Sequence, residues 1–161
     1  MTASRPSRGS AITRLVAREA PPPAQLTPFV VDASVSAAWF LPDEATDYTR
    51  AALQATTRRA VWVPSLWVPE MANLLHGAQR RRRITAAQRI ELAAAASALR
   101  LQVCREPVSL QTLDALAAEY VLSAYDACYL ELALRRQLPL ATLDAALLKA
   151  MGKAGVPRAE P

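Results

Sequence analysis

The stretch Phe29-Val30-Val31-Asp32 decides the expected fold. Its three apolar residues form a short uninterrupted run, which is typical of a strand buried on both faces of a parallel sheet. Similar apolar runs recur further along the chain, at residues 61–63, 101–103 and 138–142. Segments with Ala and Leu at helical spacing lie between them. This alternation of short strands with single or paired helices predicts an α/β domain with a parallel sheet.

Capping residues and chain-breaking residues set the expected helix limits. Ser34, Thr85, Ser109, Ser123 and Asp144 each precede a segment with helical spacing and are favoured at helix starts. Gly and Pro residues, together with the basic run 80–83, are expected to end or interrupt helices. The expected helices cover residues 34–40, 46–57, 65–80, 85–99, 109–122, 123–136 and 144–152.

Length and composition bound the class of protein. The chain has 161 residues, of which 52% are hydrophobic, and only four glycines, which favours one helix-rich globular domain. Residues 1–28 contain four arginines and one glutamate, so they carry +3 of the net charge of +5. A Pro-Pro-Pro sequence closes this stretch, and nothing in it could build a core. We therefore predict a flexible basic extension over residues 1–28 and a domain over residues 29–157.

Several classes of site and location are poor fits. Cys104 and Cys128 lack the spacing of metal ligands, and His76 is the single histidine. Zinc sites, cysteine nucleophiles and a disulfide framework are therefore disfavoured, and reduced thiols are expected. No apolar run approaches the roughly 18 residues needed to span a bilayer. We expect a cytoplasmic protein with no membrane association.

Four acidic residues fall where a parallel sheet binds its ligands, beyond the carboxyl ends of the strands. Asp32 follows the first strand and Asp144 follows the last, while Glu70 and Asp126 lie in the first turns of helices. Carboxylates that converge in this way repel one another unless a cation or bound protons offset the charge. Oxygen ligands without histidine or cysteine favour Mg²⁺ or Mn²⁺.

Each acid also has a purely structural interpretation. Asp32 and Asp144 fit helix N-caps, Asp126 completes a Ser-x-x-Asp capping pattern with Ser123, and Glu70 complements a helix dipole. Ser34 and Thr142 are polar neighbours that fit either a capping role or a role in orienting an acid. Arginine pairs and the run 80–83 fit either RNA contacts or solvated helix ends. The three tryptophans favour core or dimer packing over base stacking.

Four segments together resemble PIN-domain proteins of the VapC toxin type. They are VVDASV (residues 30–35), VPEMANLL (68–75), SAYDACYLELA (123–133) and ATLD (141–144), and they occur in the family's order and at its usual intervals. The resemblance covers about residues 29–156. The N-terminal extension departs from the family pattern, and so does the short, polar C-terminal end where the family has its last strand.

The resemblance implies both a fold and an activity. The fold is a three-layer α/β/α sandwich around a short, mostly parallel sheet of four or five strands. The activity is that of an endoribonuclease that depends on Mg²⁺ or Mn²⁺ and acts as the toxin of a type II toxin–antitoxin pair. Asp32, Glu70, Asp126 and Asp144 match the family's acids as catalytic and metal-binding residues. The implied partners are an RNA substrate, a VapB-type antitoxin and a second copy of the chain in a homodimer.

Other functions fit the residues less well. A phosphotransferase or phosphatase of the haloacid-dehalogenase kind needs a second acid two positions after Asp32, where the chain has Ser34. A catalytically inert PIN-like module that binds RNA or protein has little reason to keep all four acids. A purely structural interaction domain, in which every acid is a cap, predicts that no metal binds.

Overall fold

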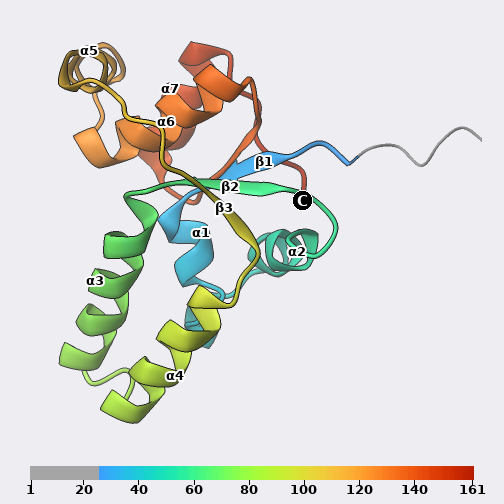
Figure 1. The fold of residues 1–161 in the computed structure, drawn as a ribbon, viewed down its shortest axis with the longest axis vertical. Helices are drawn as coiled ribbons and strands as arrows, with labels where there is room; N and C mark the ends of the chain where they lie inside the picture. Colours follow the sequence, from blue (N-terminus) through green and yellow to red (C-terminus); the bar gives the residue numbers. More distant parts are fainter. Residues whose placement is uncertain (1–25) are drawn as a thin grey trace, which may run out of the picture.

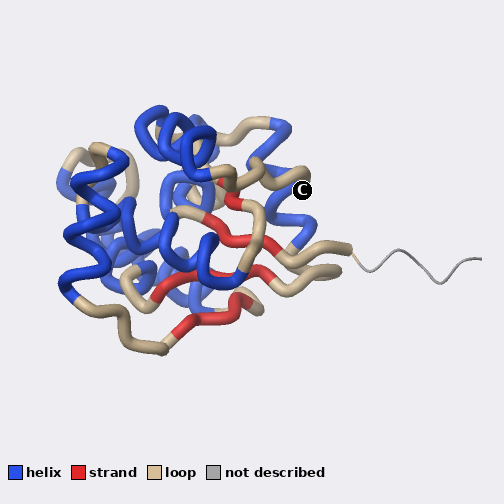
Figure 2. Tube along the Cα trace, turned by 90° about the horizontal axis from the view of Figure 1, so that it is seen from above, coloured by secondary structure: helices blue, strands red, loops and turns tan. Residues whose placement is uncertain are grey.

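Each short apolar run of the sequence forms a strand in the computed structural model, which describes residues 26–161. The strands are β1 (Phe29–Val31), β2 (Val61–Pro64), β3 (Leu101–Cys104) and β4 (Leu140–Ala141). They form one parallel sheet in the order β3-β2-β1-β4. The two central strands, β1 and β2, therefore pair on both edges. Figure 2 shows the strands side by side between the helices.

Helices cover both faces of the sheet, so the domain has three layers (Figure 1). One face carries α5, α6 and α7, and the other carries α1 to α4. This confirms the predicted PIN-like α/β/α architecture. The helices are α1 (Ala33–Ala37), α2 (Asp47–Ala55), α3 (Trp67–Arg80), α4 (Ala86–Ser97), α5 (Leu110–Tyr120), α6 (Ala124–Arg136) and α7 (Ala145–Ala154), with a 3₁₀ turn at Pro42–Glu44.

The core lies on the two faces of β1 and β2. All three residues of β1 are fully buried, as are Val61 and Val63 of β2. The inner face of α6 supplies Tyr129 and Leu130, also without solvent exposure. A strand buried on both faces needs apolar residues at every position, which explains the uninterrupted runs in the sequence.

Several helix ends differ from the prediction. Helix α1 begins at Ala33 and is only five residues long, and the Ser34 hydroxyl does not cap it but bonds to Asp32 instead. Helix α7 continues through Gly152 and ends before Gly155, whose φ of +70° provides the left-handed C-terminal turn. Gly152 therefore lies inside a helix because the terminating conformation falls three residues later.

The C-terminal segment adds a single bridge next to β4. Leu140 pairs with Arg158 in parallel, and the Ala159 amide donates to the Leu140 carbonyl at 3.0 Å. The sheet thus has four strands among the described residues, and the C-terminal segment contributes only this isolated bridge. The predicted extension over residues 1–28 falls almost wholly outside the described residues. No helix between residues 26 and 161 is both long enough and apolar enough to cross a membrane.

Candidate active site

The four predicted acids line one cavity of about 450 Å³ beyond the carboxyl ends of β1 and β4. Asp32 directly follows β1, and Asp144 lies three residues after β4. Glu70 comes from the first turn of α3 and Asp126 from the first turn of α6. These two helices lie on opposite faces of the sheet (Figure 1). The structure thus brings together four residues that are far apart in the sequence.

Asp32 is the most buried of the four, with 5% of its surface exposed. Its Oδ2 accepts hydrogen bonds from the Ser34 hydroxyl at 2.5 Å and the Thr142 hydroxyl at 2.8 Å. Burial raises the pKa of Asp32, and these two hydrogen bonds only partly counteract that rise. Asp32 does stand at the N-cap position of α1, but its side chain makes no standard capping hydrogen bond to that helix. Its side-chain donors are thus neutral hydroxyls, and no arginine or lysine between residues 26 and 161 pairs with it.

Glu70, on α3, is oriented by a residue from the helical layer on the opposite face of the sheet. The Tyr129 hydroxyl, on α6, donates a short hydrogen bond to Glu70 Oε2. Partial burial raises the pKa of Glu70, the bond from Tyr129 works against this, and the negative charges of Asp32 and Asp126 raise it further. Burial and the neighbouring carboxylate also raise the pKa of Tyr129, so its hydroxyl stays protonated and remains a donor.

Asp126 and Asp144 combine a capping role with a place in the cavity. Ser123 caps α6 by accepting from the Asp126 amide at 3.1 Å, and its hydroxyl donates to Asp126 Oδ2 at 2.7 Å. Asp144 caps α7, where its Oδ1 accepts from the Leu147 amide at 2.8 Å. Each carboxylate still has an oxygen free of a hydrogen bond from the described residues, so capping leaves both able to bind a further ligand.

The charge in this cavity is suited to a hard cation. The negative charge of Asp126 raises the pKa of Asp32, and the charges of Asp32 and Asp126 both raise the pKa of Glu70. No described lysine or arginine forms an ion pair with any of the four acids. The described residues contain no group of three or more acidic, histidine or cysteine side chains packed closely enough to form a ready-made metal cluster. The donor set nevertheless fits Mg²⁺ or Mn²⁺, which favour carboxylate oxygens and keep several bound waters.

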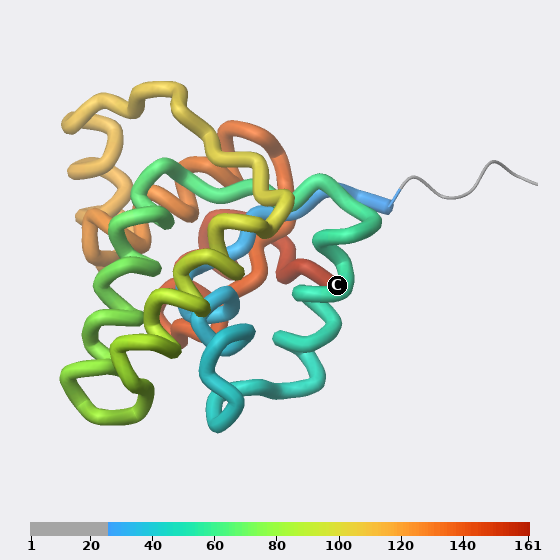
Figure 3. Tube along the Cα trace, turned by 60° about the horizontal axis from the view of Figure 1, so that its bottom comes forward, coloured from blue at the N-terminus to red at the C-terminus, as the bar shows by residue number. Residues whose placement is uncertain are grey.

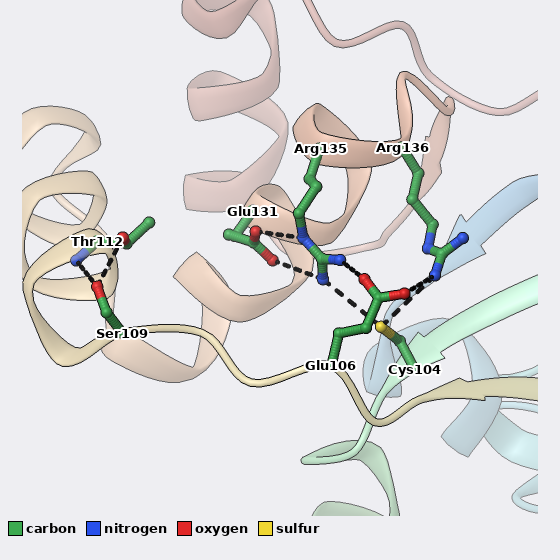
Figure 4. Close-up of polar contacts among 7 residues, drawn as sticks. All are labelled: Cys104, Glu106, Ser109, Thr112, Glu131, Arg135 and Arg136. Atoms are coloured by element: carbon green, nitrogen blue, oxygen red, sulfur yellow. Dashed lines mark hydrogen bonds and ion pairs between the residues drawn. The ribbon is translucent and has the colours of Figure 1, made fainter.

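A second polar cluster fixes the far end of α6 (Figure 4). Arg135 pairs with Glu106 and, at 2.6 Å, with Glu131, while Arg136 pairs with Glu106 at 3.0 Å. The Arg136 guanidinium also stacks on the Trp62 ring at 3.8 Å. These contacts tie α6 to β2 and to the segment after β3. The helix that carries Asp126 and Tyr129 is therefore anchored at both ends.

Sequence reasoning missed the part played by Tyr129. A large aromatic residue on an apolar helix face looks like an ordinary core residue, and Tyr129 is indeed fully buried. The available signal was its position three residues after Asp126, which places both side chains on one helix face. Trp67 proves to be a core residue, as predicted, and its indole donates to Ser36 at 2.8 Å. Both cysteines are free; Cys104 is buried and Cys128 partly exposed.

Comparisons with known proteins agree with this architecture. Residues 29–153 match the PIN domain family. The crystal structure of PAE2754 from Pyrobaculum aerophilum superposes with a TM-score of 0.58 at 24% sequence identity, covering 80% of this chain and 87% of that one. No curated protein is similar enough to match.

The match covers most of the chain, so this protein belongs to the PIN domain family. PIN domains are generally nucleases that use divalent metals. The likeness to the Pyrobaculum protein, at this level of identity, concerns the fold alone.

Proposed function

We propose that this chain is an endoribonuclease that hydrolyses RNA phosphodiester bonds with the help of Mg²⁺ or Mn²⁺. One observation carries the proposal: Asp32, Glu70, Asp126 and Asp144 line a single cavity at the carboxyl edge of the sheet. If the four acids acted only as helix caps, nothing would require them to face the same cavity. The volume of about 450 Å³ leaves room for a short segment of a polynucleotide.

The acids differ in the roles we assign to them. Asp32 and Asp126 are the most direct metal ligands, because they come from the end of β1 and the first turn of α6, and their charges interact. Glu70 and Asp144 hold the metal through water or orient the attacking water. A divalent ion supplies stabilisation of the negative phosphoryl oxygens and activates water near neutral pH.

Neutral hydroxyls keep the acids in position. Ser34 and Thr142 fix the orientation of Asp32, and Tyr129 fixes that of Glu70. Hydroxyl donors hold a carboxylate without neutralising it, so its charge stays available for a cation. An arginine or lysine in the same place would compete with the metal.

The finer assignment is that of a VapC-type toxin acting in the cytoplasm, paired with a VapB-type antitoxin and forming a homodimer. It is supported by the four sequence segments that resemble this subfamily and by the position of Asp32, Glu70, Asp126 and Asp144 around the cavity. Expression of the wild-type chain should arrest growth, and Asp126→Asn should relieve the arrest at equal protein level. Equal toxicity of the wild-type chain and Asp126→Asn would show that the growth arrest does not depend on the acid site.

The nuclease activity itself is tested by incubating total RNA with the purified chain in Mg²⁺, in Mn²⁺ and in EDTA. We expect discrete fragments with either metal, none in EDTA, and none from Asp126→Asn in any condition. Fragments that persist in EDTA, or with Asp126→Asn, would contradict the proposal. The fragment ends would identify the RNA that is cut.

A further inference from the structure

The arginine-rich runs of the chain differ in the contacts that their side chains make in the structure. Arg135 and Arg136 are occupied by Glu106, and Arg135 also by Glu131 (Figure 4). Arg59 donates to the backbone carbonyl of Glu160 at 2.8 Å, on another part of the surface. These residues are therefore committed to structural contacts, away from the acid cavity.

Arg80 and Arg81, by contrast, line the same cavity as the four acids. Both are exposed, and neither forms an ion pair with any acid among residues 26–161. Their neighbour Arg83 points elsewhere and pairs with Asp43 at 2.8 Å and Glu44 at 2.6 Å. Of the four arginines in the run 80–83, two thus line the cavity, Arg82 lies outside its lining, and Arg83 anchors the loop.

The end of α3 explains this division. Arg82 adopts a left-handed conformation with a φ of +58°, and the Arg83 amide donates back to the Ala78 carbonyl at 2.9 Å. This reversal turns the chain sharply between α3 and α4, which lie side by side (Figure 3). Arg83 leaves in the direction of the 3₁₀ turn, while Arg80 and Arg81 stand at the C-terminal end of α3, where they line the part of the cavity farthest along the helix from Glu70.

The Arg81 side chain packs against Gly77. A Cβ atom at position 77 would lie 3.3 Å from Arg81 Nη1 and 3.5 Å from Nη2. Gly77 itself lines the cavity one helical turn before Arg81. The guanidinium therefore packs closely against Gly77, and an added Cβ atom would require it to shift by a few tenths of an ångström.

We propose that Arg80 and Arg81 bind backbone phosphates of the RNA strand and hold it against the carboxylates. The inference rests on the proposed nuclease function. A polyanion that approaches four carboxylates is repelled, and fixed cations beside them offset that repulsion. The planar guanidinium binds phosphate oxygens through paired hydrogen bonds. Because no carboxylate among the described residues occupies these two guanidinium groups, both remain available to the substrate.

The test is steady-state cleavage of a defined RNA by the double variant Arg80→Gln/Arg81→Gln over a range of salt concentrations. We expect KM to rise by roughly tenfold for each arginine removed, because a hydrogen bond to a charged group disappears in each case. We expect kcat to stay nearly unchanged, since these hydrogen bonds form in both ground and transition states. The slope of log KM against log salt should fall by about 0.7 for each phosphate that is no longer bound.

Two further variants keep the test specific. Arg82→Asn removes one positive charge close to Arg80 and Arg81 but outside the cavity lining, and Asn tolerates the left-handed conformation. It should leave KM and the salt slope close to those of the wild type. Gly77→Ala requires the Arg81 guanidinium to shift by only a few tenths of an ångström, so KM should rise far less than in the double variant, while the melting temperature stays equal or rises because Ala is the better helix former.

The outcomes distinguish this inference from the function on which it rests. If the wild type cleaves RNA and the double variant has the same KM and salt slope, the phosphate role is overturned and the nuclease function stands. An equal rise in KM for Arg82→Asn would also overturn it, because it would reflect net charge alone. If the wild-type chain neither binds nor cleaves RNA with metal present, both proposals fail together.

Discussion

The Tyr129 hydroxyl donates a hydrogen bond to Glu70 Oε2, and this contact joins two helices that lie on opposite faces of the sheet. The bond therefore orients an acid of the cavity and also links α3 to α6. Its donor is fully buried and its acceptor half-buried, so water replaces it poorly.

Tyr129→Phe should impair both stability and activity. Removing the donor costs about 1–3 kcal/mol in free energy of unfolding, since it leaves Glu70 with an unmet acceptor. Glu70 then loses its fixed orientation, so kcat should fall while KM for RNA stays nearly constant. Chemical denaturation and steady-state cleavage measure the two effects. Tyr120→Phe, which removes a phenol away from the cavity, is the control and should leave kcat unchanged.

Asp32→Asn should stabilise the metal-free protein at neutral pH. The pKa of Asp32 is higher in the folded chain than in the unfolded one, so ionisation favours unfolding. The stability that comes from the protonated form is complete below the unfolded pKa and is lost as pH rises through the folded pKa. Asn accepts the same two hydroxyl bonds without a charge. The melting temperature of Asp32→Asn in EDTA should exceed that of the wild type at neutral pH, and the gap should shrink in acid.

Thr142→Val should destabilise the strand end that carries the site. The Thr142 hydroxyl donates to Asp32 at 2.8 Å and accepts from the Asp144 amide at 3.0 Å. Valine leaves the Asp32 carboxylate and the Asp144 amide without the hydroxyl partner, which lowers the free energy of unfolding by about 1–3 kcal/mol. Thr142→Ser keeps the hydroxyl and should recover most of the stability. Equal stability of the valine and serine variants, measured by urea denaturation, would show that the hydroxyl contributes little.

Two substitutions of Asp144 separate its capping role from its charge. Asn is as good an N-cap as Asp, so Asp144→Asn should keep the stability of α7 while removing a negative charge from the cavity. Asp144→Ala removes both the cap and the charge, and loss of the cap lowers the free energy of unfolding by about 1 kcal/mol. We expect weaker Mn²⁺ affinity in both variants and reduced thermal stability only in the alanine variant. Unchanged Mn²⁺ affinity in Asp144→Asn would remove Asp144 from the metal site.

The fold was predictable because its strands are buried on both faces. That burial requires uninterrupted apolar runs such as Phe29–Val31, and these are visible in the sequence. Because parallel strands end at one common edge, the positions of Asp32 directly after one strand and of Asp144 shortly after another were enough to predict that both lie at that edge. Helix limits were less predictable, as Gly152 shows: a glycine alone does not reveal whether its backbone adopts the left-handed conformation.

The interactions within the site were only partly predictable. Ser34 and Thr142 lie next to the acids in sequence, and the structure shows both donating to Asp32. The bond between Tyr129 and Glu70 spans 59 residues, and the packing of Arg81 on Gly77 depends on the end of α3. Neither relation has a local sequence pattern, because each depends on how separate elements meet or end in space.

The binding of a divalent cation by the four carboxylates is tested most directly by calorimetric titration of Mn²⁺ into the metal-free chain and into Asp32→Asn. We predict saturable binding to the wild type and an affinity at least roughly tenfold weaker in the variant, because a charged ligand is replaced by a neutral one. No binding to the wild type, or equal affinity in both chains, would contradict the metal site.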